Sequence, residues 1–190
     1  RPTAATRPSR TGKPPRHRWR CSIKTNSLSF GQLLVPKTPS DAAIHEAGHA
    51  VFARLAKMHI DKIRLDPTPR VDVSYARFVV SIGSFLNFNL AGEIAQHLLG
   101  KGPPPGRADT TEGSDGYKSW LLLRGLGYST PQALVEIEAA RKTLEEHILD
   151  ETFARPTILR LAAELDKRRT LTSADLEKFG FGVLLMPEAA

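Results

Sequence analysis

The chain has 190 residues and a formal charge of +7, with 27 Lys and Arg against 20 Asp and Glu. This length fits one domain with a short extension. The single cysteine, Cys21, excludes an internal disulfide and a cysteine-based zinc site, and no apolar run reaches the roughly 18 residues that a membrane span needs.

The positive charge is concentrated at the start of the chain. Residues 1–37 hold nine Lys or Arg and no acidic residue, whereas the rest is nearly neutral. Frequent prolines and little apolar material predict a disordered basic tail over residues 1–38, followed by a folded domain over residues 39–190. The tail is interpreted either as a solvated extension or as an arm for nucleic acid or an acidic surface, and it contains no RNA-binding motif that favours the arm.

An Arg-rich beginning without acidic residues is also typical of organelle transit peptides, although the prolines disfavour the amphipathic helix that such peptides form. The expected location is therefore the cytoplasm, with organelle targeting by the basic N-terminus left open.

The first regular element is predicted to be a helix from Asp41 to about Lys57. Ser40 and Asp41 are favourable residues for a helix start, and the Ala-rich stretch that follows contains no proline. Alternation of apolar and polar residues then predicts two short strands, at residues 59–66 and 71–75, joined by a hairpin turn.

Helices are predicted for most of the remainder. A helical pattern runs from about Ser84 to Leu99 and stops at residues 100–106, a loop with three glycines and three prolines. Further helices are predicted over residues 113–124, 131–151, 156–169 and 173–179. The predicted fold class is therefore mainly α, with a small β element.

Residues 45–49 read His-Glu-Ala-Gly-His, the HExxH pattern, and lie on the first predicted helix. Residues four apart on a helix lie one turn above each other, so both imidazoles can bind one ion at about 2.0 to 2.1 Å. Glu46 points to one side, where its carboxylate can take a proton from the water that the metal activates and pass it to the leaving amine. The pattern predicts a zinc peptidase site with His45 and His49 as ligands and Glu46 as the base.

A catalytic zinc site needs a third protein ligand. A metzincin would have Gly at position 52 and His at position 55, where this chain has Phe52 and Leu55, so that class is excluded. Three acidic residues stay open as the third ligand: Glu93 on the second long helix, and Glu112 or Asp115 after the glycine- and proline-rich loop.

Three segments together resemble the peptidase domain of FtsH: HEAGHA at 45–50, LAGEIAQHLLG at 90–100 and TEGSD at 111–115. The apolar pattern of the C-terminal helices is also similar, so the resemblance covers about residues 40–180. It implies a helical zinc metallopeptidase domain in which His45, His49 and Asp115 bind Zn²⁺ and Glu46 is the base. It also implies a homo-oligomer, because the family forms rings together with an ATPase module.

The chain departs from that family in three respects, one of which is a shorter and poorly matched stretch from His59 to Ser81. The family's helix usually reads Gly-Arg-Ala-Ala-Glu-Glu, whereas residues 92–97 read Gly-Glu-Ile-Ala-Gln-His, so the groups that support the metal ligands are rearranged. Glu93 and His97 are interpreted as a polar helix face rather than a second metal pair. The sequence contains no P-loop of the form GxxxxGK[ST], so ATP-driven unfolding of substrates would require a separate ATPase.

The leading hypothesis is a zinc endopeptidase that hydrolyses unfolded or flexible polypeptides without using ATP itself. The alternative is a zinc-stabilised regulatory or interaction module with little proteolytic activity, whose basic tail binds nucleic acid or an acidic partner. Glu46 favours the enzyme, because metal binding alone needs no general base. The altered segment 93–97 favours the module.

Overall fold

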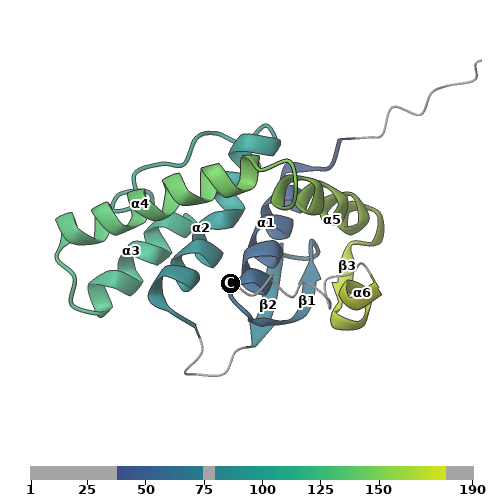
Figure 1. Cartoon of the computed structure of the whole chain (residues 1–190), viewed down its shortest axis with the longest axis horizontal. Coiled ribbons are helices and arrows are strands. Elements are labelled where there is room, and N and C mark those ends of the chain that lie inside the picture. The colour runs from purple at the N-terminus through teal and green to yellow at the C-terminus, as the bar shows by residue number, and fades with distance from the viewer. Residues whose placement is uncertain (1–37, 75–79, 179–190) are drawn as a thin grey trace, which may run out of the picture. The chain divides into compact units, whose positions relative to one another are not determined.

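The computed structural model of the chain describes residues 38–74 and 80–178. The predicted basic tail, apart from Thr38, lies outside the described residues. Within the described ranges the protein is mainly helical, with one small antiparallel sheet (Figure 1). In chain order the elements are α1 (Asp41–Leu55), β1 (His59–Arg64), β2 (Arg70–Ser74), α2 (Ile82–Leu99), α3 (Asp115–Gly125), α4 (Thr130–Leu149), α5 (Ala154–Arg168), β3 (Thr170–Thr172) and α6 (Ser173–Lys178).

Helix α1 is the central element and packs against α2, α5 and the sheet (Figure 1). It begins where predicted, because the Ser40 hydroxyl accepts a hydrogen bond from the Ala43 N–H at 3.3 Å. Gly48 lets α2 approach closely, since a Cβ at that position would lie only 2.6 Å from the carbonyl oxygen of Ala91. The two helices therefore pack with their backbones close together along the face that carries the histidines.

The sheet has the order β2-β1-β3, and β1 is antiparallel to both neighbours. The predicted hairpin is confirmed, with Ile63 opposite Val71. Strand β3 is absent from the sequence-based expectation, because three residues carry too little alternation to reveal a strand. It is defined by its pairing with β1, in which Leu171 lies opposite Ile63 and is fully buried.

The remaining predicted helices are present, with shifted ends. Helix α2 begins two residues earlier than predicted because the Ser81 hydroxyl accepts from the Ser84 N–H at 3.1 Å. Helix α3 begins at Asp115 rather than residue 113, because Ser114 caps it through the Tyr117 N–H. The loop at residues 100–106 contains no regular structure, as predicted.

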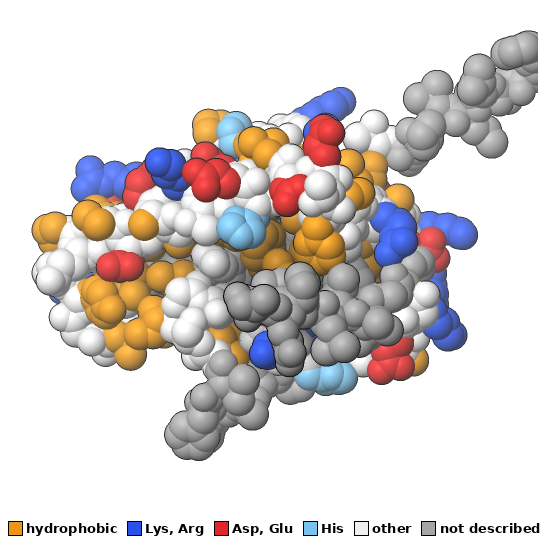
Figure 2. All heavy atoms as spheres, in the orientation of Figure 1, with side chains coloured by type: hydrophobic (Ala, Val, Ile, Leu, Met, Phe, Trp, Pro, Cys, Tyr) orange, Lys and Arg blue, Asp and Glu red, His pale blue; other side chains and the backbone are white. Residues whose placement is uncertain are grey.

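Apolar side chains form part of the visible surface at α3 (Figure 2). Figure 2 shows apolar side chains gathered where Figure 1 places α3, and Leu121 and Leu126 are each about half exposed. Leu123 is fully buried, so the apolar run that begins at Trp120 contributes to both core and surface. Elsewhere on this face acidic and basic side chains are interspersed (Figure 2). Within residues 38–74 and 80–178, no helix combines the length and apolar character that crossing a membrane requires.

Candidate metal centre

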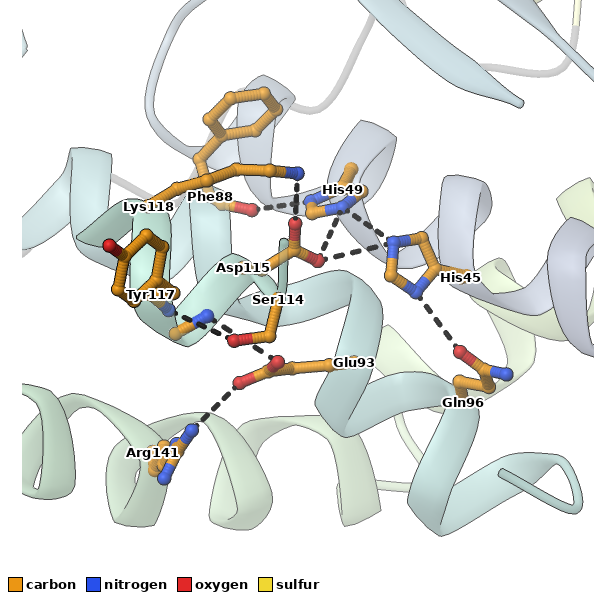
Figure 3. Close-up of polar contacts among 11 residues, drawn as sticks. His45, His49, Phe88, Glu93, Gln96, Ser114, Asp115, Tyr117, Lys118 and Arg141 are labelled. Atoms are coloured by element: carbon orange, nitrogen blue, oxygen red, sulfur yellow. Dashed lines mark hydrogen bonds and ion pairs between the residues drawn. The ribbon is translucent and has the colours of Figure 1, made fainter. Parts of the chain in front are cut away.

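Helices α1 and α3 bring three of the predicted site residues together. His45 and His49 lie one turn apart on α1, and Asp115 is the first residue of α3, which packs beside α2 (Figure 3). Asp115 follows its cap Ser114 directly, so the helix N-terminus favours its negative charge. Among the described residues, these three form the group of His, Cys, Asp or Glu side chains able to hold one metal ion.

The three donor atoms form a nearly equilateral triangle. The Nε2 atoms of His45 and His49 are 3.1 Å apart, and each lies 3.2 Å from Oδ2 of Asp115. Donor atoms bound to one tetrahedral zinc ion at about 2.0 to 2.1 Å lie roughly 3.3 Å from one another. The spacing therefore fits three ligands of a single ion with little rearrangement.

Helix α2 orients both imidazoles and determines which ring nitrogen carries the proton. His49 donates from Nδ1 to the carbonyl oxygen of Phe88 at 2.7 Å, and His45 donates from Nδ1 to Oε1 of Gln96 at 3.1 Å. A neutral imidazole that carries its proton on Nδ1 presents a lone pair on Nε2. Two nitrogen lone pairs and a carboxylate oxygen thus face one another, an arrangement that requires a proton or a metal cation between them.

Asp115 is buried and remains ionised. Its Oδ2 has no polar partner other than the two imidazoles among the described residues, and it lies 3.2 Å from Nε2 of each, while Oδ1 accepts from Nζ of Lys118 at 2.7 Å. Burial alone would raise the pKa of Asp115, but its contacts with His45 and His49 outweigh burial and hold that pKa well below its usual range. The buried Oδ2 is the atom that a cation between the imidazoles would bind.

The contact with Asp115 raises the pKa of His49. Burial alone would lower the pKa of His49, but its hydrogen bond to Asp115 and the charge of that carboxylate outweigh burial and raise it. A proton on His49 would balance the carboxylate in the place where a metal ion would. Because ligands must lose such protons to bind a metal, the metal and the proton compete for the same place.

Gly92 provides the space in which the two imidazoles meet. A Cβ at this position of α2 would overlap Nε2 of His49 and would lie 2.7 Å from Nε2 of His45. Phe88, Gly92 and Gln96 follow one another at four-residue spacing and so occupy one face of α2. On that face, the Phe88 carbonyl accepts from His49, Gly92 leaves space for both rings, and the Gln96 amide accepts from His45.

Glu46 is buried beside the donor group, the three candidate metal ligands His45, His49 and Asp115, and 5% of its surface is exposed. Burial raises the pKa of Glu46, although the nearby charges of His49 and His45 oppose the shift. A carboxylate with a raised pKa is a stronger base than an exposed one, which suits a group that accepts a proton near neutral pH.

The other candidate ligands lie elsewhere. Glu93 accepts hydrogen bonds from Arg141 at 3.0 Å and from the Gly116 N–H at 3.4 Å, so it supports the start of α3 next to Asp115 (Figure 3). His97 contacts the carbonyl oxygen of Gly102, and Glu112 is exposed. Neither Glu93 nor Glu112 belongs to the three-residue donor group, so the expectation that either replaces Asp115 finds no support in the geometry.

Sequence reasoning missed the supporting groups. The Phe88 carbonyl carries no residue-type signal, and Gln96 stands out in the sequence only as a departure from the FtsH pattern. The four-residue spacing of Phe88, Gly92 and Gln96 was the available signal, because it matches that of His45 and His49 on the facing helix.

Comparison with family models and with curated proteins adds no relative to this picture. No protein-family model matches the chain. No curated protein matches it in sequence either. A functional proposal therefore rests on the motif and on the arrangement of these side chains.

Proposed function

We propose that the protein is a zinc metallopeptidase of the FtsH type that hydrolyses peptide bonds of unfolded or flexible polypeptides. The observation that carries the proposal is the convergence of three acceptor atoms from His45, His49 and Asp115, with Glu46 on the same helix as two of them. Two imidazole nitrogens and a buried carboxylate oxygen that face one another at 3.1 to 3.2 Å need a shared proton or cation, and a metal ion would supply that charge.

The donor set supports zinc as the ion. Two imidazoles and one carboxylate make a ligand set of the kind found in catalytic zinc sites, and three protein ligands leave a position free. When bound, zinc would polarise the scissile carbonyl and make a water molecule more acidic. No cysteine is needed for such a site, consistent with a chain whose single cysteine is Cys21.

The chain's own residues have separate tasks in this proposal. Phe88 and Gln96 hold the imidazoles so that Nε2 of each faces inward. The Glu46 carboxylate accepts a proton from the attacking water and delivers it to the nitrogen of the leaving amine. Its burial supports this task, because a raised pKa brings the carboxylate closer to the working pH.

The proposed substrates are polypeptides that already lack compact structure. The sequence contains no P-loop to drive unfolding by ATP hydrolysis. A separate ATPase, or a homo-oligomer of this chain, would present longer substrates to the site.

A zinc-stabilised regulatory module is the second candidate, and Gln96 is the observation that favours it. Histidines that bind metals often donate to a carboxylate, which strengthens them as ligands. An amide oxygen in that place has no negative charge, so the support of His45 is weaker. In this proposal the basic tail binds nucleic acid or another acidic partner.

Cleavage of casein by purified wild type and by the Glu46→Gln variant tests the enzyme proposal. The variant should retain zinc, because Glu46 is not a ligand, but lose about 10²- to 10⁴-fold in rate because the general base is gone. Glu136→Gln, which removes an exposed carboxylate of α4, is the matched control and should cleave as wild type does. Zinc-loaded wild type that cleaves no unfolded substrate would favour the regulatory module instead.

A further inference from the structure

Lys118 makes a contact with the donor group that the proposed mechanism does not use. It lies one turn after Asp115 on α3, and its Nζ is 2.7 Å from Oδ1 of that residue. Figure 3 shows the ammonium group reaching back over Asp115, on the side of His49. The Lys118 side chain is 62% exposed, whereas that of Asp115 is 6% exposed.

The two oxygens of Asp115 have different surroundings. Oδ1 is engaged by the ammonium group of Lys118, whereas Oδ2 lies 3.2 Å from both imidazole nitrogens. A carboxylate can bind a cation through one oxygen or through both. Engagement of Oδ1 by an ammonium group disfavours the second mode, because that oxygen is then held by another positive charge.

We propose that Lys118 keeps Asp115 a one-oxygen ligand and so preserves an open position on the metal for water and substrate. This inference rests on the metallopeptidase function proposed above. Lys118 is a positioning residue in this account, since it acts through Asp115. Catalytic zinc sites are distinguished from structural ones by such an open position.

The contact contributes little to the stability of the fold. The Lys118 end of this ion pair is 62% exposed, so water screens it and a long side chain must be held in place. The backbone of α3 at this point is already held by Ser114 and Glu93, which accept from the Tyr117 and Gly116 N–H groups. Loss of the lysine should therefore leave the fold intact.

Substitution of Co²⁺ for the native ion reports the coordination directly, since four-coordinate Co²⁺ absorbs visible light more strongly than five- or six-coordinate Co²⁺. The Lys118→Met variant should bind Co²⁺ about as tightly as wild type but with weaker visible absorption, and its kcat for casein should fall about tenfold. Lys118→Arg should keep the visible absorption and the kcat of wild type, because a guanidinium group can also donate to Oδ1. Lys142→Met, an exposed lysine on α4, is the matched control.

The outcomes separate this inference from the function on which it rests. Wild type that takes up no Co²⁺ would overturn the metal proposal itself. If wild type binds Co²⁺ and cleaves casein, but Lys118→Met has the same spectrum and kcat, the inference about Lys118 alone is wrong. A shared thermal melting profile of the variants shows that neither result arises from unfolding.

Discussion

Gly92 on α2 faces Nε2 of His49 on α1 so closely that even a methyl group on Gly92 would overlap that nitrogen. The carbon of that methyl group would also lie only 2.7 Å from Nε2 of His45. The absence of a side chain at one position of α2 is thus what lets two imidazoles of α1 turn inward. Helices α1 and α2 therefore shape the candidate metal centre together.

Gly92→Ala should therefore reduce zinc affinity more strongly than a substitution next to an ordinary ligand, by more than about a hundredfold. The added methyl group displaces both imidazoles from their inward positions. Titration with zinc in competition with a chromophoric chelator measures the change. Gly83→Ala on the same helix is the control, because a Cβ there meets only the Ser81 hydroxyl oxygen, at 3.9 Å, and zinc affinity should not change. Equal zinc affinity of Gly92→Ala and wild type would contradict the arrangement.

Substitution of Gln96 should weaken or strengthen zinc binding, depending on the residue that replaces it. Gln96→Ala removes the acceptor that orients His45 and should weaken zinc binding about ten- to a hundredfold. Gln96→Glu places a carboxylate on the same Nδ1–H and should strengthen binding, because a charged acceptor makes the imidazole a better ligand. The same chelator competition measures both variants. Identical affinities in the three proteins would show that Gln96 does not support the ligand.

Glu93 should matter for stability and not for zinc stoichiometry. Its carboxylate forms a largely buried ion pair with Arg141, whose Nη2 also donates to the Gly106 carbonyl oxygen at 2.9 Å. Glu93→Ala leaves Arg141 with only the exposed carboxylate of Glu138, at 3.9 Å, as its counter-charge and should destabilise the fold by about 3 kcal/mol. Urea unfolding in chelator measures the free energy, and elemental analysis of the folded variant should still find one zinc per chain. Loss of zinc with unchanged stability would instead make Glu93 a ligand.

Asp175 should make stability depend on pH in the acid range. Its carboxylate accepts from the Thr172 N–H at 3.0 Å and the Thr172 hydroxyl at 2.8 Å, and it pairs with Arg168 at 2.8 Å. These contacts, of which the backbone hydrogen bond is the largest, lower the pKa of Asp175 to about 2 from the usual 3.8. Because the folded pKa is the lower one, the stabilisation is complete above the unfolded value and is lost as pH falls through the folded value.

The Asp175→Asn variant tests this dependence. Urea unfolding in chelator should show it less stable than wild type near pH 6, with the difference shrinking as the pH falls below 3.8 toward about 2. Glu145→Gln, an exposed residue of α4, serves as the control for a general change of charge. A difference between Asp175→Asn and wild type that stays constant over this range would refute the assignment.

Local rules are sufficient for much of the fold and for three of the four predicted site residues. The helix that carries His45, Glu46 and His49 follows from its cap and its uninterrupted Ala-rich sequence, and the four-residue spacing places both histidines on one face. Asp115 was one of three open choices from spacing alone, and only the resemblance to FtsH singled it out. The structure brings its Oδ2 to 3.2 Å from both imidazoles.

What the sequence could not predict depends on contacts between distant segments. Strand β3 exists through its pairing with β1, which lies more than a hundred residues earlier in the chain. The Phe88 carbonyl has no side-chain signature, and the role of Gln96 depends on how α2 is rotated against α1. Glu93 stays open as a ligand in the sequence, since nothing there indicates that an arginine 48 positions later pairs with it.

Zinc binding by wild type, Asp115→Asn and Glu112→Gln, measured by chelator competition and elemental analysis, tests the central claim most directly. We expect one zinc per chain in wild type, unchanged binding in Glu112→Gln, and an affinity lowered by more than about a hundredfold in Asp115→Asn. Wild type without zinc, or an Asp115→Asn variant that binds zinc as tightly as wild type, would contradict the assignment of the metal centre.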